Sequence, residues 1–304
     1  ILSAAVVTGA QAIHPGFGFL SENSAFATMC EEMNIRFIGP SSTIIDLMGN
    51  KANARKTMIA ADVPVTPGSE GYISSYEEAV VQAEKIGYPV ILKAAAGGGG
   101  KGMRKVYQEN GLEAAFSQAK AEAKAAFGDD SMYLEKIITP ARHIEVQILG
   151  DSFGNVVHLG ERDCSLQRNH QKVLEESPST FISEETRKAM GDVAIRAAKH
   201  VGYTNAGTIE FLVDTEQRFY FMEMNTRIQV EHPVTEMATG IDIVKEQLRI
   251  ASGEPLSFTQ DEVAITGHTI ECRINAENPA LGFRPSSGKI DYLFLPSGGN
   301  GLRV

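Results

Sequence analysis

The sequence has no excess of positive charge, few cysteines and no long apolar run, and each absence excludes a class of protein. The formal net charge of −10 over 304 residues argues against nucleic acid or an anionic membrane as the main partner. The cysteines, Cys30, Cys164 and Cys272, lie far apart without a C-x-x-C pair, which predicts a reducing compartment and no structural zinc site. No apolar run is long enough to cross a bilayer, and no signal peptide or repeat is recognisable.

Length and composition predict a globular protein with two or three domains. Hydrophobic residues make up 43% of the chain and charged residues 22%, which is ordinary for such proteins. The chain opens at Ile1 rather than Met and ends at Val304 soon after a glycine-rich turn, so we expect a fragment of a longer protein. We place the domain bounds at residues 1–48 (a partial α/β domain), 49–68 (a connecting helix and a Pro/Gly linker), 69–136 (a compact α+β unit) and 137–304 (a larger domain).

The first 48 residues read as alternating helix and strand, which predicts part of a parallel sheet. Ser21 is expected to cap a helix that holds Phe26 and Met29. The turn before this helix contains Gly16 and Gly18 but lacks the full dinucleotide-binding fingerprint, so it carries little information alone.

The most informative stretch runs from Thr208 to His232, where two strands joined by a polar turn are expected. If the second strand stays extended, the polar residues from Glu223 to Glu231 alternate with apolar ones and share one face. Carboxylates inside apolar strands are costly to bury without a cation. Glu210, Glu223 and Asn225 therefore form a candidate set of oxygen ligands for Mg²⁺ that carries substrate phosphates. A solvated polar face on an edge strand is the alternative.

Four consecutive glycines, Gly97 to Gly100, follow a strand that ends near Lys93. Glycines lose much backbone entropy on ordering, so such a run indicates close approach of the backbone to a ligand. Together with Lys93 and Lys101, the exposed N–H groups predict a phosphate cradle, although the pattern G-x-x-x-x-G-K-[ST] is absent. A surface hairpin tip remains an alternative, and Lys51, at the start of a helix, has the alternative of an ordinary surface lysine.

The second half of the chain predicts further strands and helices around this stretch. Residues 143–149 and 156–160 alternate as strands, and residues 184–200 and 241–252 read as helices. Residues 161–172 mix both charge signs and read as a polar loop, either solvated or lining an anion site. A last strand is expected at residues 268–275, with Arg273 on its polar face.

These features together resemble the ATP-grasp fold, and the motifs narrow the resemblance to biotin carboxylase, the component shared by acetyl-CoA, propionyl-CoA and pyruvate carboxylases. The motifs are H-P-G-F-G-F-L-S-E-N, K-A-A-A-G-G-G-G-K-G-M, E-R-D-C-S-L-Q-R-N-H-Q-K and E-M-N-T-R-I-Q-V-E-H-P-V-T-E. The resemblance covers essentially all of the chain. It implies an α/β (α+β) ATP-grasp protein with a mobile glycine-rich lid and a partial, Rossmann-like N-terminal (pre-ATP-grasp) domain.

The resemblance also implies site residues. For ATP these are Lys51 and Lys93 at the phosphates, Gly97, Gly98, Gly99, Gly100 and Met103 in the lid, Glu135, Lys136 and Ile138 at the adenine, His143 and Gln167 near the ribose, and His170 near the terminal phosphates. Glu210, Glu223 and Asn225 would carry Mg²⁺ or Mn²⁺. Around bicarbonate, carboxyphosphate and biotin would lie Gln229, Val230 and the expected catalytic residues Lys172, Arg227, Glu231 and Arg273.

The reaction implied by the resemblance is the ATP-dependent carboxylation of carrier-bound biotin with bicarbonate. The implied partners are a biotin carboxyl carrier, a carboxyltransferase and a second copy of the complete chain, in the cytoplasm or, in a eukaryote, the mitochondrial matrix. Glu231 is the expected general base, because strand alternation would place it beside the anion-binding Arg227; orienting an arginine is its alternative role. Another ATP-grasp carboxylate–amine ligase and an inactive nucleotide-binding scaffold are the alternative functions.

Overall fold

The computed structural model of the chain describes residues 1–69, 71–94, 102–169, 171–296, 299 and 301–304. The chain divides into two units, Ile1–Glu271 and Cys272–Val304. Within the described residues, no helix combines the length and the apolar character that a membrane crossing requires.

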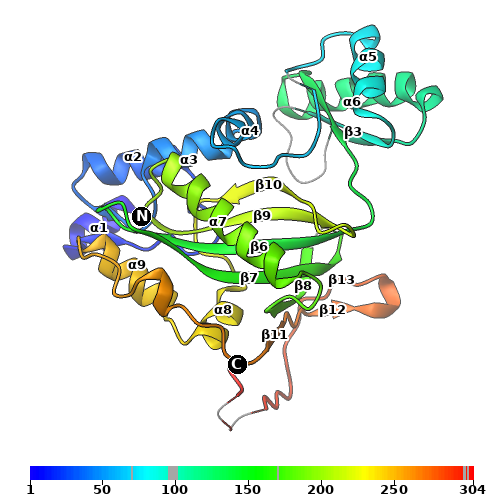
Figure 1. Cartoon of the computed structure of the whole chain (residues 1–304). Coiled ribbons are helices and arrows are strands. Elements are labelled where there is room, and N and C mark those ends of the chain that lie inside the picture. Colours follow the sequence, from blue (N-terminus) through cyan, green and yellow to red (C-terminus); the bar gives the residue numbers. More distant parts are fainter. Residues whose placement is uncertain (70, 95–101, 170, 297–298, 300) are drawn as a thin grey trace. The chain divides into compact units, whose positions relative to one another are not determined.

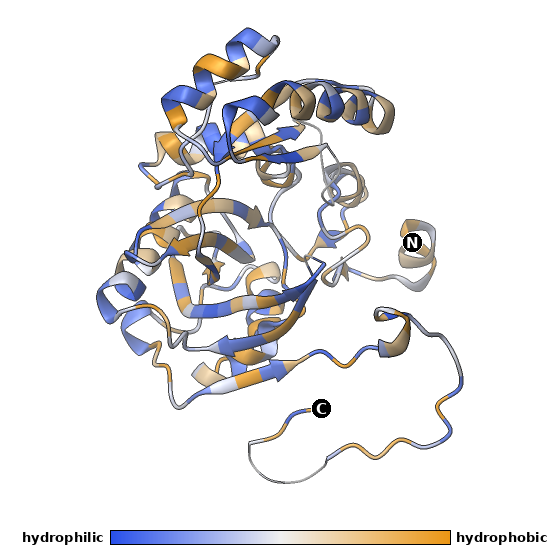
Figure 2. Cartoon of the chain, turned by 90° about the vertical axis from the view of Figure 1, so that its right-hand side faces the viewer, coloured by the Kyte–Doolittle hydropathy of each residue, from blue (hydrophilic) through white to orange (hydrophobic). Residues whose placement is uncertain are grey.

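A six-stranded sheet in the order β10-β9-β6-β7-β8-β11 forms the centre of the first unit (Figure 1). Its pairs from β10 to β8 are antiparallel. Both hydrophilic and hydrophobic residues occur along the strands (Figure 2), as expected where the two faces of a sheet differ. The strands are β6 (Ala141–Gly150), β7 (Val156–Arg168), β8 (Gln171–Ser177), β9 (Asn205–Asp214), β10 (Phe219–Asn225) and β11 (Thr269–Cys272).

The two faces of this sheet are packed differently. On one face Ile144, Val146 and Ile148 of β6 join the main hydrophobic core with residues of α7 (Glu184–His200). On the other face Leu149 joins a smaller core with residues of α9 (Ile243–Ala251), and α8 (His232–Thr239) contacts β7 and β8. The polar residues of β6 and β9 alternate along the strands with the apolar residues of the main core, so their side chains point to the second face.

Residues 69–136 contain a separate antiparallel sheet, β4-β3-β5, with its own hydrophobic core. Ser75 caps the first helix by accepting a hydrogen bond from the Glu78 N–H, and Gly87, at φ 78°, ends it, as the sequence predicts. The elements are α5 (Tyr76–Ile86), β3 (Val90–Ala94), β4 (Met103–Val106), the 3₁₀ helix η1 (Glu109–Gly111), α6 (Leu112–Phe127) and β5 (Met132–Lys136).

Two short crossings connect this subdomain, the lid, with the central sheet. In the first, the Phe221 N–H donates to the Pro64 carbonyl at 2.7 Å, while the Lys136 N–H donates to the Pro67 carbonyl at 2.7 Å. Pro64 therefore still contacts β10, whereas Pro67, three residues later, already contacts the lid. Gly68 follows, where an added Cβ would lie 2.6 Å from the Leu134 carbonyl oxygen, so only glycine fits. The second crossing runs from Lys136 to the start of β6 at Ala141.

The N-terminal residues form a parallel two-stranded pair, β1 with β2, which confirms the βα pattern expected there. Ser21 is not the helix cap: it is buried, and the Asn23 side chain accepts the capping hydrogen bond from the Phe26 N–H. The elements are α1 (Leu2–Thr8), β1 (Ala12–Ile13), α2 (Ser24–Glu32), β2 (Arg36–Phe37), α3 (Ser42–Gly49) and α4 (Lys51–Ala60).

The second unit is small and largely exposed. Its regular elements are β12 (Glu277–Asn278), the 3₁₀ helix η3 (Pro279–Leu281) and β13 (Arg284–Pro285), and β12 pairs antiparallel with β13. In the first unit another 3₁₀ helix, η2 (Gln260–Glu262), precedes β11.

Three sequence predictions of secondary structure were wrong. The predicted loop 161–172 instead forms most of the β7–β8 hairpin, because its charges pair inside the protein rather than with water. The second strand of the hairpin ends at Asn225, as expected, but the residues that follow it do not stay extended to Glu231. Helix α8 begins at His232, where only a lead-in segment was expected. The predicted strand 268–275 spans only Thr269–Cys272.

Candidate active site

A row of four charged residues crosses the second face of the central sheet. Strand register pairs Arg162 with Glu145, Glu145 with Glu210, and Glu210 with Glu223, across β7, β6, β9 and β10. One positive and three negative side chains thus stand side by side. Like charges directly opposite each other destabilise a sheet, so this row requires further cations.

Lys172 of β8 supplies one of these cations. Its Nζ donates to Glu145 Oε2 at 2.5 Å, to Glu210 Oε1 at 2.9 Å and to Glu231 Oε1 at 2.6 Å. The three carboxylates are buried and come from β6, β9 and the residue before α8. A single ammonium group therefore joins three separate segments of the chain.

The charge state of this cluster follows from its neighbours. Burial alone would raise the pKa of Glu145, but Arg162 and Lys172 outweigh it and lower that pKa. For Glu210, burial is likewise outweighed, here by the hydrogen bonds from His143 and Lys172, and the pKa falls well below its usual range. Burial would lower the pKa of Lys172, yet Glu145 and Glu210 hold it well above its usual range. The Glu145 and Glu210 carboxylates and the Lys172 ammonium are therefore ionised at neutral pH.

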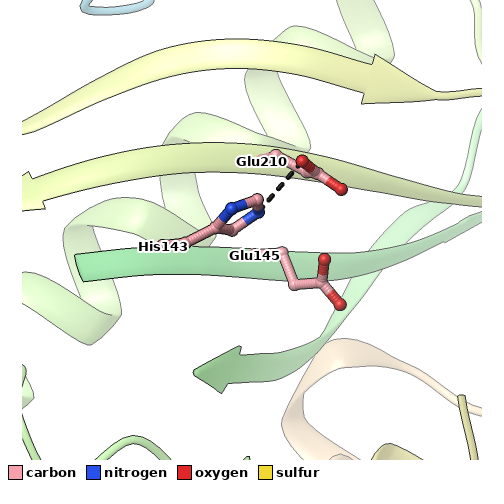
Figure 3. A group of neighbouring side chains, drawn as sticks. All are labelled: His143, Glu145 and Glu210. Carbon is pink, nitrogen blue, oxygen red and sulfur yellow. Dashed lines mark ion pairs between the residues drawn. The ribbon is translucent and has the colours of Figure 1, made fainter. Parts of the chain in front are cut away.

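His143 extends the cluster at the β6 end. Its Nε2 lies 2.9 Å from Glu210 Oε2, and its Nδ1 lies 3.0 Å from the Gln167 amide nitrogen. Burial would lower the pKa of His143, but Glu210 raises it overall. Figure 3 shows His143 and Glu145 on one strand and Glu210 on its neighbour. These three residues have ligand atoms close enough for a metal ion, but Lys172 binds two of them.

The predicted metal ligands Glu210, Glu223 and Asn225 lie together at the β9–β10 edge. Asn225 Nδ2 donates to Glu210 Oε1 at 2.8 Å, and Glu223 is the register partner of Glu210. Partial burial and the Glu210 carboxylate raise the pKa of Glu223, which is the repulsion that a cation between them would remove. The donors are all hard oxygens, so they fit Mg²⁺ or Mn²⁺.

Arg227 lies next to this edge and is held by a residue that the sequence analysis missed. Its Nε donates to Glu22 Oε2 at 3.0 Å, and its second terminal nitrogen donates to Asn225 Oδ1 at 2.9 Å. Glu22 also accepts from the Thr226 N–H at 3.0 Å. Glu22 belongs to the motif H-P-G-F-G-F-L-S-E-N, which was the only sequence signal for it.

Gln229 and Glu231 reach the cluster through a turn, so strand alternation was the wrong reason for expecting them there, and the place of Val230 in the site stays a prediction. Gln229 Nε2 donates to Glu210 Oε1 at 2.9 Å, Glu231 accepts from Lys172, and Val230 is half-buried. A cation that Glu231 accepts from is Lys172, and its expected proximity to Arg227 stays a prediction.

A separate pocket lies between the lid and the central sheet. Its volume is about 180 Å³. In the pocket Lys93 forms an ion pair with Glu135, and Lys51 Nζ lies 3.8 Å from Glu223 Oε2. Six of the predicted ATP-site and metal residues line it: Lys51, Lys93, Glu135, Lys136, Ile138 and Glu223.

Other predicted residues take less defined positions. Lys136 Nζ donates to the Gly87 and Tyr88 carbonyls at 2.8 and 2.7 Å, and Met103 is the register partner of Lys93. Arg273 belongs to the second unit, so its place in the site stays a prediction. Gly97, Gly98, Gly99, Gly100, Lys101 and His170 lie outside the described residues.

Two further residues of the cluster, Glu145 and Arg162, were not predicted. Glu145 stands in the alternating segment H-I-E-V-Q-I-L, where a buried acid between apolar residues was an available signal. Arg162 was assigned to a polar loop, and nothing in its neighbours signals a fully buried arginine.

Several known proteins are similar to this chain in sequence and in architecture. Residues 50–259 match the family "Carbamoyl-phosphate synthase L chain, ATP binding domain", and residues 1–45 match "Biotin carboxylase, N-terminal domain". Biotin carboxylase 1 of Bacillus subtilis is 57% identical over all of this chain and 68% of its own length. The chloroplastic biotin carboxylase of Arabidopsis thaliana is 56% identical over all of this chain, which spans 56% of that relative.

Solved structures give the same result. A biotin carboxylase from Campylobacter jejuni in a complex with a nucleotide superimposes with a TM-score of 0.93 at 54% identity, over 98% of this chain and 67% of that one. The biotin carboxylase domain dimer of Hydrogenobacter thermophilus 2-oxoglutarate carboxylase, bound to MgADP, ADP and bicarbonate, has a TM-score of 0.92 at 52% identity, over 98% and 66%.

Proposed function

Because the chain belongs to the biotin carboxylase family and has the ATP-grasp fold expected from its motifs, we propose that the protein carboxylates biotin with ATP and bicarbonate. One observation carries the proposal. Glu223 lines the pocket between lid and sheet and stands opposite Glu210 in the buried cluster. Phosphates of a nucleotide in the pocket would therefore meet the metal-ligand set beside Lys172 and Arg227.

In the proposed reaction a bicarbonate oxygen attacks the γ-phosphorus of ATP, and the bond from that phosphorus to the β,γ-bridging oxygen breaks. The products are carboxyphosphate and ADP. Carboxyphosphate then breaks into phosphate and CO₂. N1′ of biotin attacks the CO₂ and loses its proton to the released phosphate. Phosphoryl transfer depends chiefly on positioning and on charge neutralisation, which are the properties of the observed cluster.

Each side chain has a defined task in this scheme. Lys51 and Lys93 bind the phosphates, and Glu210, Glu223 and Asn225 hold Mg²⁺, which neutralises phosphate charge. Lys172 and Arg227 bind bicarbonate, with the planar fork of Arg227 matching the anion. Glu231 accepts the bicarbonate proton during the attack. A closed lid keeps water away from carboxyphosphate, which would otherwise hydrolyse.

The proposed partners follow from the reaction. Biotin is a carrier-bound substrate, so a biotin carboxyl carrier and a carboxyltransferase complete the proposed cycle. Relatives named as parts of larger carboxylases include a pyruvate carboxylase subunit of Methanothermobacter thermautotrophicus at 53% identity. We also propose a homodimer for the complete protein, as in the Hydrogenobacter structure. A cytoplasmic location stays a prediction.

The decisive experiment measures ADP release by the full-length protein that contains this chain, with and without bicarbonate and with and without free biotin. We expect ADP release to require bicarbonate and to increase with biotin, and to stop when Mg²⁺ is chelated. ATP cleavage that ignores bicarbonate but responds to a carboxylate and an amine would indicate the alternative ATP-grasp ligase. Nucleotide binding without cleavage would indicate a scaffold.

A further inference from the structure

Arg162 is the most completely bonded side chain in the cluster. It is fully buried, and each of its five N–H groups has a side-chain acceptor. Nε donates to Glu145 at 2.5 Å. The terminal nitrogens donate to Gln147, Thr235 and Gln229 at 2.8 Å each, and to Thr208 at 3.3 Å. These acceptors come from β6, β9, the turn after β10 and α8, so one guanidinium group fixes the mutual position of four segments.

Through Glu145, Arg162 reaches the proposed anion-binding side of the site. Glu145 Oε1 accepts from Arg162 while Oε2 accepts from Lys172. Arg162 thus neutralises one of the three carboxylates around Lys172 and fixes its orientation. Without Arg162, the charge of the buried Glu145 carboxylate would be compensated less completely, and the excess negative charge would repel bicarbonate.

Through Gln229, Arg162 reaches the proposed metal side. The Gln229 side-chain oxygen accepts from Arg162 at 2.8 Å, so its NH₂ group faces Glu210 Oε1 at 2.9 Å. If the amide turned over, its oxygen would face a carboxylate oxygen, which is repulsive. The guanidinium group therefore sets which end of Gln229 meets a metal ligand.

We propose that Arg162 is a positioning residue that couples the two sides of the site, placing Lys172 through Glu145 and Glu210 through Gln229. This inference rests on the proposed function, because it assigns the anion side and the metal side by the roles given there. Arg162 itself touches neither reactant in this scheme. A purely structural role is the alternative, because loss of one partner from a buried ion pair leaves an unpaired charge and destabilises the fold. The test must therefore separate the two roles.

The test compares Arg162→Lys with a matched control, Arg187→Lys. Lysine keeps the charge of Arg162, but its three donors cannot reach five acceptors. Arg187 bonds Glu161, Glu184 and the Ser179 carbonyl, none of which belongs to the cluster. We expect R162K to lower kcat for bicarbonate-dependent ATP cleavage roughly 10- to 100-fold, since a misplacement of about 1 Å costs up to about 10²-fold. We also expect it to raise both the bicarbonate KM and the Mg²⁺ concentration needed for half-maximal turnover, because both sides of the site lose their positioning. R187K should alter only the melting temperature.

A second variant keeps the proposal testable if R162K does not fold. Thr235→Val removes the acceptor on α8 but keeps the side-chain shape, and Thr235 bonds Arg162 without touching Lys172 or Glu210 in the described contacts. We expect a smaller loss of kcat in the same direction. Wild-type kcat and bicarbonate KM in every variant that folds, at a reduced melting temperature, would make Arg162 a purely structural residue and overturn the proposal.

A crystal structure of a folded variant separates failure of this proposal from failure of the proposed function. If the wild-type protein shows no bicarbonate-dependent ATP cleavage, the proposed function fails, and the variant structure still decides the positioning role. Displaced Glu145 and Gln229 side chains in R162K, or in T235V if R162K does not fold, would support it. Side chains in their wild-type positions, still bonded to Lys172 and Glu210, would contradict it.

Discussion

The buried charge cluster around Lys172 and the pocket beside the lid, which we propose as the nucleotide site, differ in how their charges are solvated and paired. In the cluster Lys172 is 13% exposed and bonds three carboxylates, and Glu145 and Glu210 among them are bonded by other residues as well. In the pocket Lys51 is 42% exposed, and among the described residues its one ion pair is the 3.8 Å contact with Glu223. Desolvated charges need complete partners before a ligand arrives, whereas half-exposed charges exchange water for phosphate at little cost. The proposed reaction centre is therefore preorganised, whereas the proposed nucleotide site can adapt to its ligand.

The largest effect is expected when the proposed base, Glu231, is removed from the cluster. Glu231→Gln keeps the shape and a hydrogen bond to Lys172 but removes the charge and the basicity. We expect kcat for bicarbonate-dependent ATP cleavage to fall ~10²–10⁴-fold, with ATP binding intact. The control is Glu236→Gln, since Glu236 accepts from the Ile243 N–H at the start of α9. Near-normal kcat with a raised bicarbonate KM would leave Glu231 as a binding residue.

Lowering the pH should remove the contribution that the cluster's carboxylates make to the stability of the fold. The pKa values of Glu145 and Glu210 are lowered in the folded protein from 4.5, so their contribution to stability is complete above that pH and is lost as the pH falls below it. A carboxylate whose pKa falls by about two units contributes roughly 2.6 kcal/mol. Urea unfolding between about pH 6 and pH 3 should show this loss, and Glu145→Gln should make it shallower. An unfolding free energy that does not change over this range would contradict the assignment.

Glu223 lines the pocket and also stands opposite Glu210 of the cluster, so Glu223→Gln tests which of the two regions it serves. Its side chain is 44% exposed, and we expect little change in melting temperature without ligand. Loss of one carboxylate should raise the Mg²⁺ concentration needed for half-maximal turnover about tenfold, which corresponds to ~1.4 kcal/mol. Glu216→Gln, in the exposed β9–β10 turn, is the control. A sharp fall in melting temperature with unchanged MgATP turnover would make Glu223 structural.

The smallest effect is expected for the lid, whose angle should change on nucleotide binding while its internal structure stays the same. The lid has its own core, and its two crossings are short, so residues 69–136 should move as a rigid body when nucleotide binds, with the backbone angles changing near Thr66 and Thr139. Crystal structures with and without nucleotide should differ in lid angle but not within the lid. The same lid angle in both would show that the pocket is as fixed as the cluster.

Much of this architecture was predictable from sequence because it depends on local signals. The β9–β10 hairpin, the Ser75 cap and helix α7 were expected within a few residues of their observed bounds. The charge row was not, because it depends on strand register, which places Arg162 opposite Glu145 across β7 and β6. A polar segment reads as a solvated loop unless its partners are known, and those partners are distant in sequence.

The contact between Glu22 and Arg227, 205 positions apart in sequence, has a consequence for protein engineering. A shortened chain that begins at α4 would keep every lysine and carboxylate around Lys172, together with the lid. It would lack the acid that orients Arg227 and binds the Thr226 N–H. Grafting the catalytic part onto another protein would therefore require the segment around Glu22 to be carried along, or a substitute carboxylate to be designed on the new host.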